Sequence, residues 1–384
     1  MSRYSASSAG QSGHRFARVF TQPDDLSEDV IRASLASAWD FRACALSYQP
    51  VGFGSHHWLA ADAAGRQLFL TVHDLTAMLT GSADTAEAAY GRLHTAFECA
   101  VSLRRDAQLT FVIAPLPAAD GRAVRRLSAR YTLVVCPYLA DCEPGYEGEF
   151  SAEDRPAMVR ILAALHRARP LAAPQRCDFA LPNADGLRAA LARTSERWSG
   201  GPYGERARSL LARNAAGVTT LMAAYEELVR QVRQRTSRLV VTHGEPGTWN
   251  TLKTPAGFVI VDWDFVQLAP PERDLWALAD SDGSVLAAYA DATGIAVDAA
   301  ALALFRMWFD LSEIADYICL FRDTHSDTQD AAESWQNLEV YLRPAERWPQ
   351  LQLTRSTGLG CALVPAQGGP SVALSWDITC GGRR

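Results

Sequence analysis

The spacing of hydrophobic and polar residues divides the chain into a strand-rich first part and a helix-rich second part. Residues 27–39 predict a helix, because Ser27 can cap it and Val30, Ile31 and Leu35 can share one face. Short apolar runs between glycines or polar turns predict strands, and one longer periodic stretch predicts another helix. These elements are strands near 46–50, 56–61, 67–73, 109–114 and the 130s, and a helix at 84–104.

From Asp154 onward the pattern is mainly helical and rich in Ala, Leu and Arg. Two apolar runs, 239–241 and 258–261, interrupt it and predict a hairpin-like pair of strands around a polar loop. Strands with few helices, followed by a mainly helical half, predict an α+β fold with a small β-rich lobe and a larger helical lobe. The predicted helices are 154–169, 183–198, 203–235, 272–280, 284–291, 298–322 and 325–341.

The same pattern predicts the domain organisation. We expect a disordered leader at 1–24, an N-lobe that binds nucleotide at 25–139, a catalytic and substrate-binding C-lobe at 140–351, and a poorly ordered or accessory tail at 352–384. The leader has no apolar core like that of a signal peptide. No run of about 18 uncharged apolar residues occurs, so we expect a cytoplasmic protein without a membrane partner.

Charge and cysteine content narrow the function classes. The formal net charge is −6, which argues against a nucleic-acid partner and suits a cationic small-molecule substrate. The 8 cysteines form no CxxC pair, so we expect reduced thiols rather than a sulfur-bound metal. The chain has a single lysine, Lys253. Every other strong base is an arginine, and this limits which groups can bind phosphate.

A group of polar residues that a structural turn does not need flanks the two apolar runs. His243, Glu245, Asn250, Asp262 and Asp264 lie within 22 positions at the ends of the predicted strands. Burying a carboxylate without a cation or a role is costly. An amide oxygen with a carboxylate suits Mg²⁺, and a further carboxylate could orient a hydroxyl and take its proton. Positioned oxygens, a divalent ion and a base are the parts that phosphoryl transfer needs.

These motifs resemble those of a known family. The segment HGEPGTWN, followed by FVIVDWD and LAPPERDLWAL, resembles the catalytic and metal-binding loops of the aminoglycoside phosphotransferase family. The runs that begin LSYQPVGFGS and WFDLSEIADY resemble its actinobacterial branch near the spectinomycin phosphotransferases. The resemblance covers about residues 25–345. It implies a bilobal protein-kinase-like fold.

The resemblance also implies a role for each matching residue. Glu245 would orient and deprotonate the acceptor hydroxyl, and Asn250 and Asp262 would hold Mg²⁺ against the phosphates of ATP or GTP. His243 and Asp274 would be structural, since Asp274 would tie the following helix back to the catalytic loop. The nucleotide contacts that the resemblance implies are Gly52, Gly54, Ser55, Thr71, Cys136, Tyr138 and Leu139.

Acidic residues are the expected substrate contacts. Asp264 follows the metal-binding position by two residues. Asp310, Glu313 and Asp316 lie in a region where the family contacts the amino groups of a cationic antibiotic. Residues three apart share a helix face, so a solvated acidic face is the other interpretation of these three residues.

The chain departs from the family pattern at two places. Glu245 stands where the family has aspartate, and the catalytic loop carries Gly247 and Trp249 where histidine and glycine are common. The family's phosphate-binding lysine is missing from the third strand, where Thr71 or a neighbour takes its position. The groups considered as replacements are His73, Arg66 and Arg42, and the role of the helix carboxylates Glu87 and Glu98 stays open.

The sequence therefore predicts a phosphotransferase that moves the γ-phosphoryl group of a nucleoside triphosphate to a hydroxyl of a small polar substrate. The leading substrate class is an aminoglycoside or aminocyclitol antibiotic. The missing lysine leaves a pseudokinase or binding protein open as an alternative. Another alternative is a kinase of a sugar, a nucleoside or an antibiotic-biosynthesis intermediate. A different group transfer on the same scaffold is a third, since a fold does not fix chemistry.

Overall fold

The structure is a computed structural model that describes residues 20–349 and 351, with gaps at 53, 145–149, 236–237 and 280–281. The predicted tail at 352–384 and most of the predicted leader lie outside the described residues. The last part of that leader, 20–24, is described. Its Phe20 N–H donates a hydrogen bond of 3.1 Å to Asp330 Oδ1.

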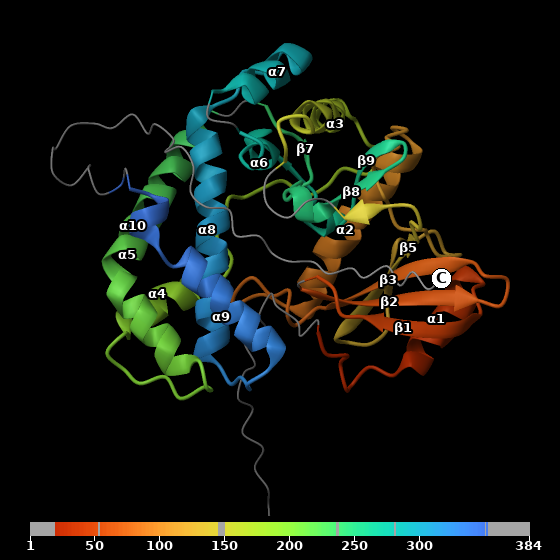
Figure 1. Cartoon of the computed structure of the whole chain (residues 1–384), viewed down its shortest axis with the longest axis horizontal. Helices are drawn as coiled ribbons and strands as arrows, with labels where there is room; N and C mark the ends of the chain where they lie inside the picture. Colours follow the sequence, from red (N-terminus) through yellow and green to blue (C-terminus); the bar gives the residue numbers. More distant parts are fainter. Residues whose placement is uncertain are drawn as a thin grey trace, which may run out of the picture.

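A five-stranded antiparallel sheet forms the N-terminal part, in the order β1-β2-β3-β5-β4 (Figure 1). Helix α1, Glu28–Trp39, is capped by Ser27 as predicted, and the Ser27 hydroxyl accepts a hydrogen bond from Asp29 N–H. Its apolar face packs with one face of the sheet in a buried core. The strands are β1 (Ala43–Gln49), β2 (Ser55–Asp62), β3 (Gln67–Asp74), β4 (Val124–Arg126) and β5 (Tyr131–Pro137).

The opposite face of the sheet joins a second core that continues into the C-terminal part. Helix α2, Ala86–Arg105, contributes Leu93 and Phe97 to this core. Val134 comes to it from β5, and Ile260 comes from the segment that carries the predicted catalytic residues. The sheet is therefore packed against the region that holds the candidate site, and α2 packs on residues 263–265.

Helices dominate the rest of the chain, and a third core lies among α4, α5, α8 and α9 (Figure 1). Helices α3 and α7 pack together beside the second core. The helix bounds are α3 (Arg155–Arg167), α4 (Ala184–Ala192), α5 (Gly204–Arg235), α6 (Glu272–Leu275), α7 (Ser284–Thr293), α8 (Ala299–Arg322), α9 (Gln329–Tyr341) and α10 (Pro344–Arg347). The predicted α+β architecture with a helical second part is confirmed.

Two predictions of secondary structure are wrong. The apolar run 109–114 is not a strand of the sheet. Its Val112 is buried and forms an isolated bridge to Ile260, so the run is apolar because it lies between the two parts of the chain. The strand that pairs with β5 at this edge of the sheet is β4 instead. The runs 239–241 and 258–261 also do not pair with each other.

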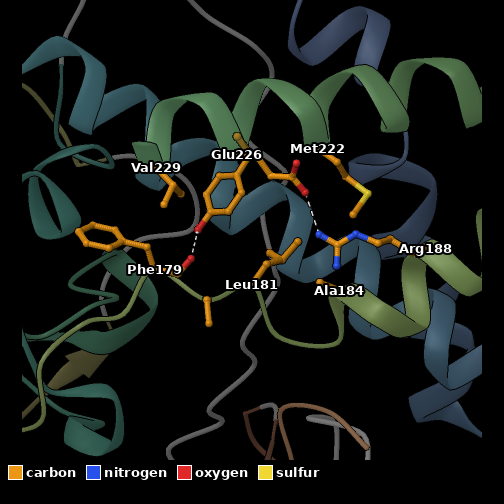
Figure 2. A pocket seen from close by; sticks show the side chains of 9 residues that line it. Phe179, Leu181, Ala184, Arg188, Met222, Glu226 and Val229 are labelled. Atoms are coloured by element: carbon orange, nitrogen blue, oxygen red, sulfur yellow. Dashed lines mark hydrogen bonds and ion pairs between the residues drawn. The ribbon is translucent and has the colours of Figure 1, made fainter. Parts of the chain in front are cut away.

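A cavity of about 320 Å³ lies among the C-terminal helices, between α4, α5 and residues 179–181 (Figure 2). At one end Tyr225 Oη donates a 2.7 Å hydrogen bond to the Phe179 carbonyl, and at the other Arg188 and Glu226 form a 2.8 Å ion pair. Its lining contains no residue that the sequence analysis assigned to the site. It is lined by Phe179, Ala180, Leu181, Ala184, Arg188, Met222, Tyr225, Glu226 and Val229.

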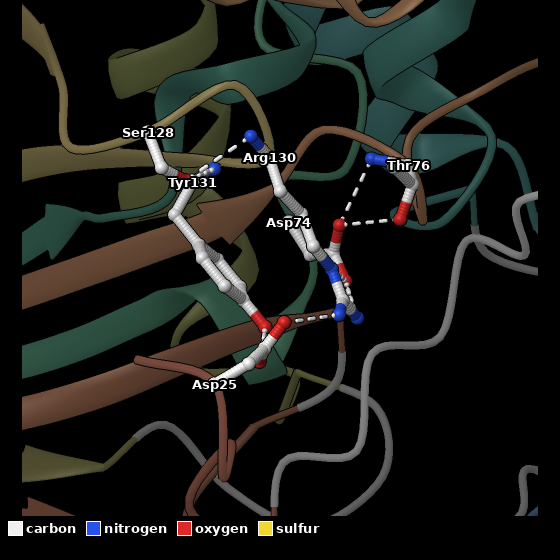
Figure 3. A network of polar contacts seen from close by, with 6 residues as sticks. All are labelled: Asp25, Asp74, Thr76, Ser128, Arg130 and Tyr131. Carbon is white, nitrogen blue, oxygen red and sulfur yellow. Dashed lines mark hydrogen bonds and ion pairs between the residues drawn. The ribbon is translucent and has the colours of Figure 1, made fainter. Parts of the chain in front are cut away.

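A polar network ties the segment before α1 to the ends of β3 and β5 (Figure 3). Arg130 bridges two carboxylates, with Nε and Nη2 at 2.9 and 2.6 Å from Asp74 Oδ2 and Nη1 at 2.7 Å from Asp25 Oδ2. Tyr131 Oη donates to Asp25 at 2.6 Å, and the buried Asp74 also accepts from Thr76. This network holds the α1 segment over the sheet.

Candidate active site

Two short antiparallel pairs position the predicted catalytic loop. Strand β7, Val240–Thr242, pairs with β10, Gln267–Ala269, and β8, Thr251–Thr254, pairs with β9, Gly257–Ile260. At the open end of the β8–β9 pair, Val261 N–H donates to the Asn250 carbonyl at 3.0 Å. This register brings Asn250 beside the segment that leads to Asp262.

His243 joins the catalytic loop to that segment. Its Nε2 lies 2.9 Å from the Val261 carbonyl, and its Nδ1 accepts the Glu245 backbone N–H at 3.2 Å. A carbonyl only accepts, so the ring proton is on Nε2 and the imidazole is neutral. Burial lowers the pKa of His243, which favours the same state. The fully buried ring also packs edge-on against Trp263 at 4.7 Å. His243 therefore supports both loops.

Asp274 holds the start of the catalytic loop from the opposite side. Its Oδ2 accepts His243 N–H at 2.8 Å, and its Oδ1 accepts Gly244 N–H at 2.7 Å. The side chain is fully buried. Burial alone would raise its pKa, but the hydrogen bond from His166 and the nearby positive charges outweigh burial and lower it. Asp274 is thus a charged acceptor for two successive backbone amides.

Three buried residues that the sequence analysis did not identify complete this support. His166 Nε2 lies 3.1 Å from Asp274 Oδ2, and its Nδ1 lies 2.7 Å from Tyr289 Oη. Arg273 donates to Thr242 Oγ1 at 2.9 Å and to the Phe265 carbonyl at 3.0 Å. His166 and Tyr289 are polar residues of the helices α3 and α7, and Arg273 is the neighbour of Asp274 in α6. None of these positions identifies a distant partner in the sequence.

The three proposed reaction-centre residues lie on segments that touch. Asn250 Nδ2 donates to the Glu245 carbonyl at 3.0 Å, which leaves its amide oxygen as the atom suited to a cation. Asp262 is exposed and has φ +64, a left-handed conformation that aspartate tolerates. Such a conformation at a strand end is a common feature of functional sites. Glu245 is half-buried.

The predicted nucleotide residues surround one face of the sheet. Gly52 and Gly54, at φ +82 and +88, occupy the connection before Ser55 at the start of β2. Thr71 lies on β3, opposite His57. Cys136 ends the same face, and burial together with the charge of Asp262 raises its pKa to about 12. Tyr138 and Leu139 follow β5. The charge of Asp262 acts on the Cys136 thiol, so the end of β5 is within electrostatic range of the segment that follows β9.

Neutral groups occupy the place where the resemblance expects an ammonium. His57 Nδ1 lies 3.2 Å from Thr71 Oγ1, and His73 Nδ1 lies 2.8 Å from Ser55 Oγ. Burial lowers the pKa of His57 to about 4 and that of His73 to about 3, so neither imidazole carries charge near neutral pH.

The other bases considered for this role lie elsewhere. Arg66 is in the turn at the far end of β2 and β3 and pairs with Asp62 at 2.5 Å. Arg42 is exposed and precedes β1. Lys253 lies on β8, 3.9 Å from Asp154. The helix carboxylates have other partners as well, since Glu98 accepts the Ala123 N–H and Glu87 pairs with Arg126.

The predicted substrate contacts divide into two groups. Asp310 is fully buried and accepts from Arg347 at 2.9 and 2.5 Å and from Trp348 Nε1 at 2.8 Å. Asp316 is also buried and accepts from Asn183 at 2.8 Å. These contacts give both residues internal roles, so we leave them out of the proposed substrate site. Asp264 and Glu313 are half-buried and stay in it.

Comparison with known proteins decides the family. The sequence profile of the phosphotransferase enzyme family matches residues 143–307, which include the whole catalytic loop. Protein StrN of Streptomyces griseus is 30% identical over 247 residues, which are 60% of this chain and 72% of that protein. The chain belongs to the phosphotransferase enzyme family. The predicted resemblance to this family is therefore confirmed.

Solved structures show the fold of this phosphotransferase family member independently. A spectinomycin phosphotransferase in complex with ADP and spectinomycin matches with a TM-score of 0.63 at 16% identity, covering 84% of this chain and 98% of that one. Its AMP-bound complex matches with a TM-score of 0.60 at 15% identity, covering 86% and 99%. The predicted bilobal protein-kinase-like fold is thereby confirmed.

The described side chains and helices bear on metal binding and on membrane insertion. Within the part of the chain that the structure describes, no group of three or more His, Cys, Asp or Glu side chains is placed to hold a metal ion. The predicted pair Asn250 and Asp262 would supply one amide oxygen and one carboxylate, a set that suits Mg²⁺ when phosphates and water complete its shell. Among the described helices, none has both the length and the hydrophobicity needed to cross a bilayer.

Proposed function

We propose that this phosphotransferase moves the γ-phosphoryl group of ATP or GTP to a hydroxyl of an aminoglycoside or aminocyclitol. The N-lobe, 25–139, would bind the nucleotide, and the C-lobe, 140–351, would bind the acceptor. The ADP and spectinomycin in the solved relative support these two ligand classes. The acidic net charge of −6 agrees with a cationic acceptor.

The observation that carries the proposal is the linkage of the three reaction-centre segments. The His243 imidazole joins the Glu245 amide to the Val261 carbonyl, and the Asn250 amide joins the Glu245 carbonyl. A base and two metal ligands on loops fixed to each other provide the positioning that phosphoryl transfer requires.

In the proposed reaction the acceptor oxygen attacks the γ-phosphorus as the bond to the bridging oxygen of the nucleoside diphosphate breaks. The acceptor proton passes to the Glu245 carboxylate. Asn250 Oδ1 and the Asp262 carboxylate would hold Mg²⁺, which neutralises phosphate charge when bound. Glutamate is one methylene longer than the family's aspartate, so its carboxylate can reach the hydroxyl from a backbone set further back.

Transfer of labelled γ-phosphate to a panel of aminocyclitols tests the proposal. Glu245→Gln is expected to reduce kcat by about 10²- to 10⁴-fold while the melting temperature is kept. Asp262→Asn, which keeps the left-handed conformation accessible, is expected to weaken Mg–nucleotide binding instead. Rates that stay at the wild-type value in both variants would show that the active site lies elsewhere.

The neutral N-lobe face favours a second candidate function, a nucleotide-binding protein that does not transfer phosphate. His57, Thr71 and His73 offer hydrogen bonds but no fixed positive charge to the α- and β-phosphates. Thermal shift with Mg–ATP separates the two functions when it is combined with the transfer assay. Stabilisation without transfer to any aminocyclitol, sugar or nucleoside supports the binding protein.

A further inference from the structure

Trp249 is a departure from the family's loop that the reaction itself does not explain. The indole lies immediately before Asn250 and is half-buried. A Cβ atom at Gly247 would collide with three atoms of this ring. Gly247 has φ −76, so the backbone does not require glycine there. Glycine at 247 instead leaves room for the Trp249 ring. Together, Gly247 and Trp249 place an indole against the catalytic loop.

Three more half-buried rings extend this surface. The ring of Phe309, on α8, lies 6.3 Å from that of Trp249, 5.1 Å from that of Trp276 and 5.9 Å from that of Tyr341. We call these four residues the aromatic wall. They come from the catalytic loop, the segment after α6, α8 and the end of α9, so distant parts of the sequence build it.

Negative charge surrounds one end of the aromatic wall. Glu313 follows Phe309 by one helical turn and shares its face of α8. Burial raises the pKa of the Tyr341 phenol, and the charges of Glu313, Asp310 and Glu245 act in the same direction. Glu245 and Glu313 therefore both act electrostatically on this phenol.

Arg347 offsets part of this negative charge. Its guanidinium pairs with Asp310 and lies 5.1 Å from the centre of the Tyr341 ring, which acts against the rise in that pKa. The pairing balances Asp310. Glu245, Glu313, Asp310 and Arg347 together carry a formal charge of −2, which favours a cationic ligand beside the wall.

We propose that the aromatic wall forms one side of the acceptor site and selects substrates that combine a saturated ring with an ammonium group. This inference rests on the proposed function. The C–H-rich face of such a ring would lie on Trp249 and Phe309, because aromatic faces bind apolar surface and attract cations. The ammonium group would lie near Glu313, and a hydroxyl would then face Glu245. A neutral polyol has no ammonium group and would lack the contact with Glu313.

Steady-state kinetics with Mg–ATP and three acceptors, spectinomycin, kanamycin A and the neutral myo-inositol, test the inference. Trp249→Leu is expected to raise the KM of the amine-bearing acceptor, whether spectinomycin or kanamycin A, about tenfold. It should leave kcat within about threefold and the KM for Mg–ATP unchanged, since a wall residue binds ground and transition states alike. Glu313→Gln should raise the same KM and leave that of myo-inositol unaltered.

Trp308→Leu is the matched control. Trp308 precedes Phe309 on α8, is half-buried and donates through Nε1 to the Ala180 carbonyl at 2.9 Å, away from the wall. Its replacement is expected to leave the KM of the amine-bearing acceptor and the KM for Mg–ATP unchanged. Melting temperatures and affinity for a non-hydrolysable ATP analogue show that each variant is folded. If Trp249→Leu unfolds the protein, the milder Trp249→Phe is compared through the quenching of tryptophan fluorescence by the acceptor.

The outcomes separate the inference from the function on which it rests. Loss of acceptor affinity in Trp249→Leu and Glu313→Gln, with nucleotide affinity kept, supports the aromatic wall. An unchanged acceptor KM in both variants, or equal use of myo-inositol and the amine-bearing acceptors, overturns the inference while transfer itself still stands. Absence of transfer to every acceptor, with nucleotide bound, contradicts the proposed function.

Discussion

Replacing Gly244 with alanine tests how the catalytic loop is held. Gly244 lies between His243 and Glu245 and has φ +107, a conformation that side chains rarely adopt. Gly257, in the β8–β9 turn, has a similar φ of +116, but a Cβ there would meet nothing within 4 Å. Gly257→Ala therefore measures the backbone cost alone, and Gly244→Ala adds the cost of packing.

The magnitude follows from the surroundings of each glycine. Forcing alanine into the left-handed region costs roughly 1–2 kcal/mol at either site. A Cβ at Gly244 would lie 2.5 Å from Nη2 of Arg273 and 2.7 Å from its Cζ. The guanidinium is buried and bonded to Thr242 and Phe265, so moving it breaks hydrogen bonds worth about 1–3 kcal/mol. We expect a loss of about 2–5 kcal/mol for Gly244→Ala and 1–2 kcal/mol for Gly257→Ala.

Differential scanning calorimetry and the phosphate-transfer assay measure both effects. Gly244→Ala is expected to lower the melting temperature at least twice as much as Gly257→Ala and to reduce kcat, because Glu245 follows directly. If both variants had equal shifts in melting temperature and equal activity, the conclusion that the Arg273 guanidinium packs against this loop would be refuted.

Three further predictions concern buried charge. Asp274→Asn should cost about 2–4 kcal/mol in thermal unfolding, because one amide N–H loses its acceptor, whereas the exposed Asp185→Asn should cost little. Below pH 6.5, calorimetric stability should fall, because burial lowers the pKa of three β2–β3 histidines. Their folded-state pKa values lie below the unfolded value of 6.5, so their contribution is complete above pH 6.5 and is lost as pH falls through the folded values. At pH 5 the buried neutral His73 alone should lower the free energy of unfolding by about 2 kcal/mol, and replacing it with glutamine should flatten the pH profile. The folded-state pKa is about 4 for His56, about 4 for His57 and about 3 for His73. Arg130→Met should lower the melting temperature and increase hydrogen exchange in α1, because two carboxylates lose their shared partner; unchanged exchange there would contradict this role.

Local sequence signals predicted the elements that depend on neighbouring residues. Ser27 caps α1 as expected because capping involves only the next few residues. The run 109–114 was misassigned because an apolar pattern reports burial and does not report strand pairing. The pairing of 239–241 with 258–261 failed for the same reason, since each run found a closer partner in β10 or β8.

The candidate site was predictable where a motif carried it and not where distant residues complete it. Glu245, Asn250 and Asp262 belong to two short motifs whose order and spacing are specific. The contact of His166 with Asp274 spans 108 positions, and no local pattern encodes it. The interior role of Asp310 depends on Arg347 and Trp348, which lie two helices later. A helical acidic pattern alone could not separate that role from substrate binding.

The most direct test of the central claim is a crystal structure with Mg²⁺ and a non-hydrolysable ATP analogue. We predict a metal ion at about 2.0–2.1 Å from Asn250 Oδ1 and an Asp262 carboxylate oxygen, with phosphate oxygens in its shell. The Glu245 carboxylate should face the γ-phosphate across the space for an acceptor hydroxyl. A nucleotide bound in the cavity near Phe179, or a metal without Asn250 and Asp262 as ligands, would contradict the account.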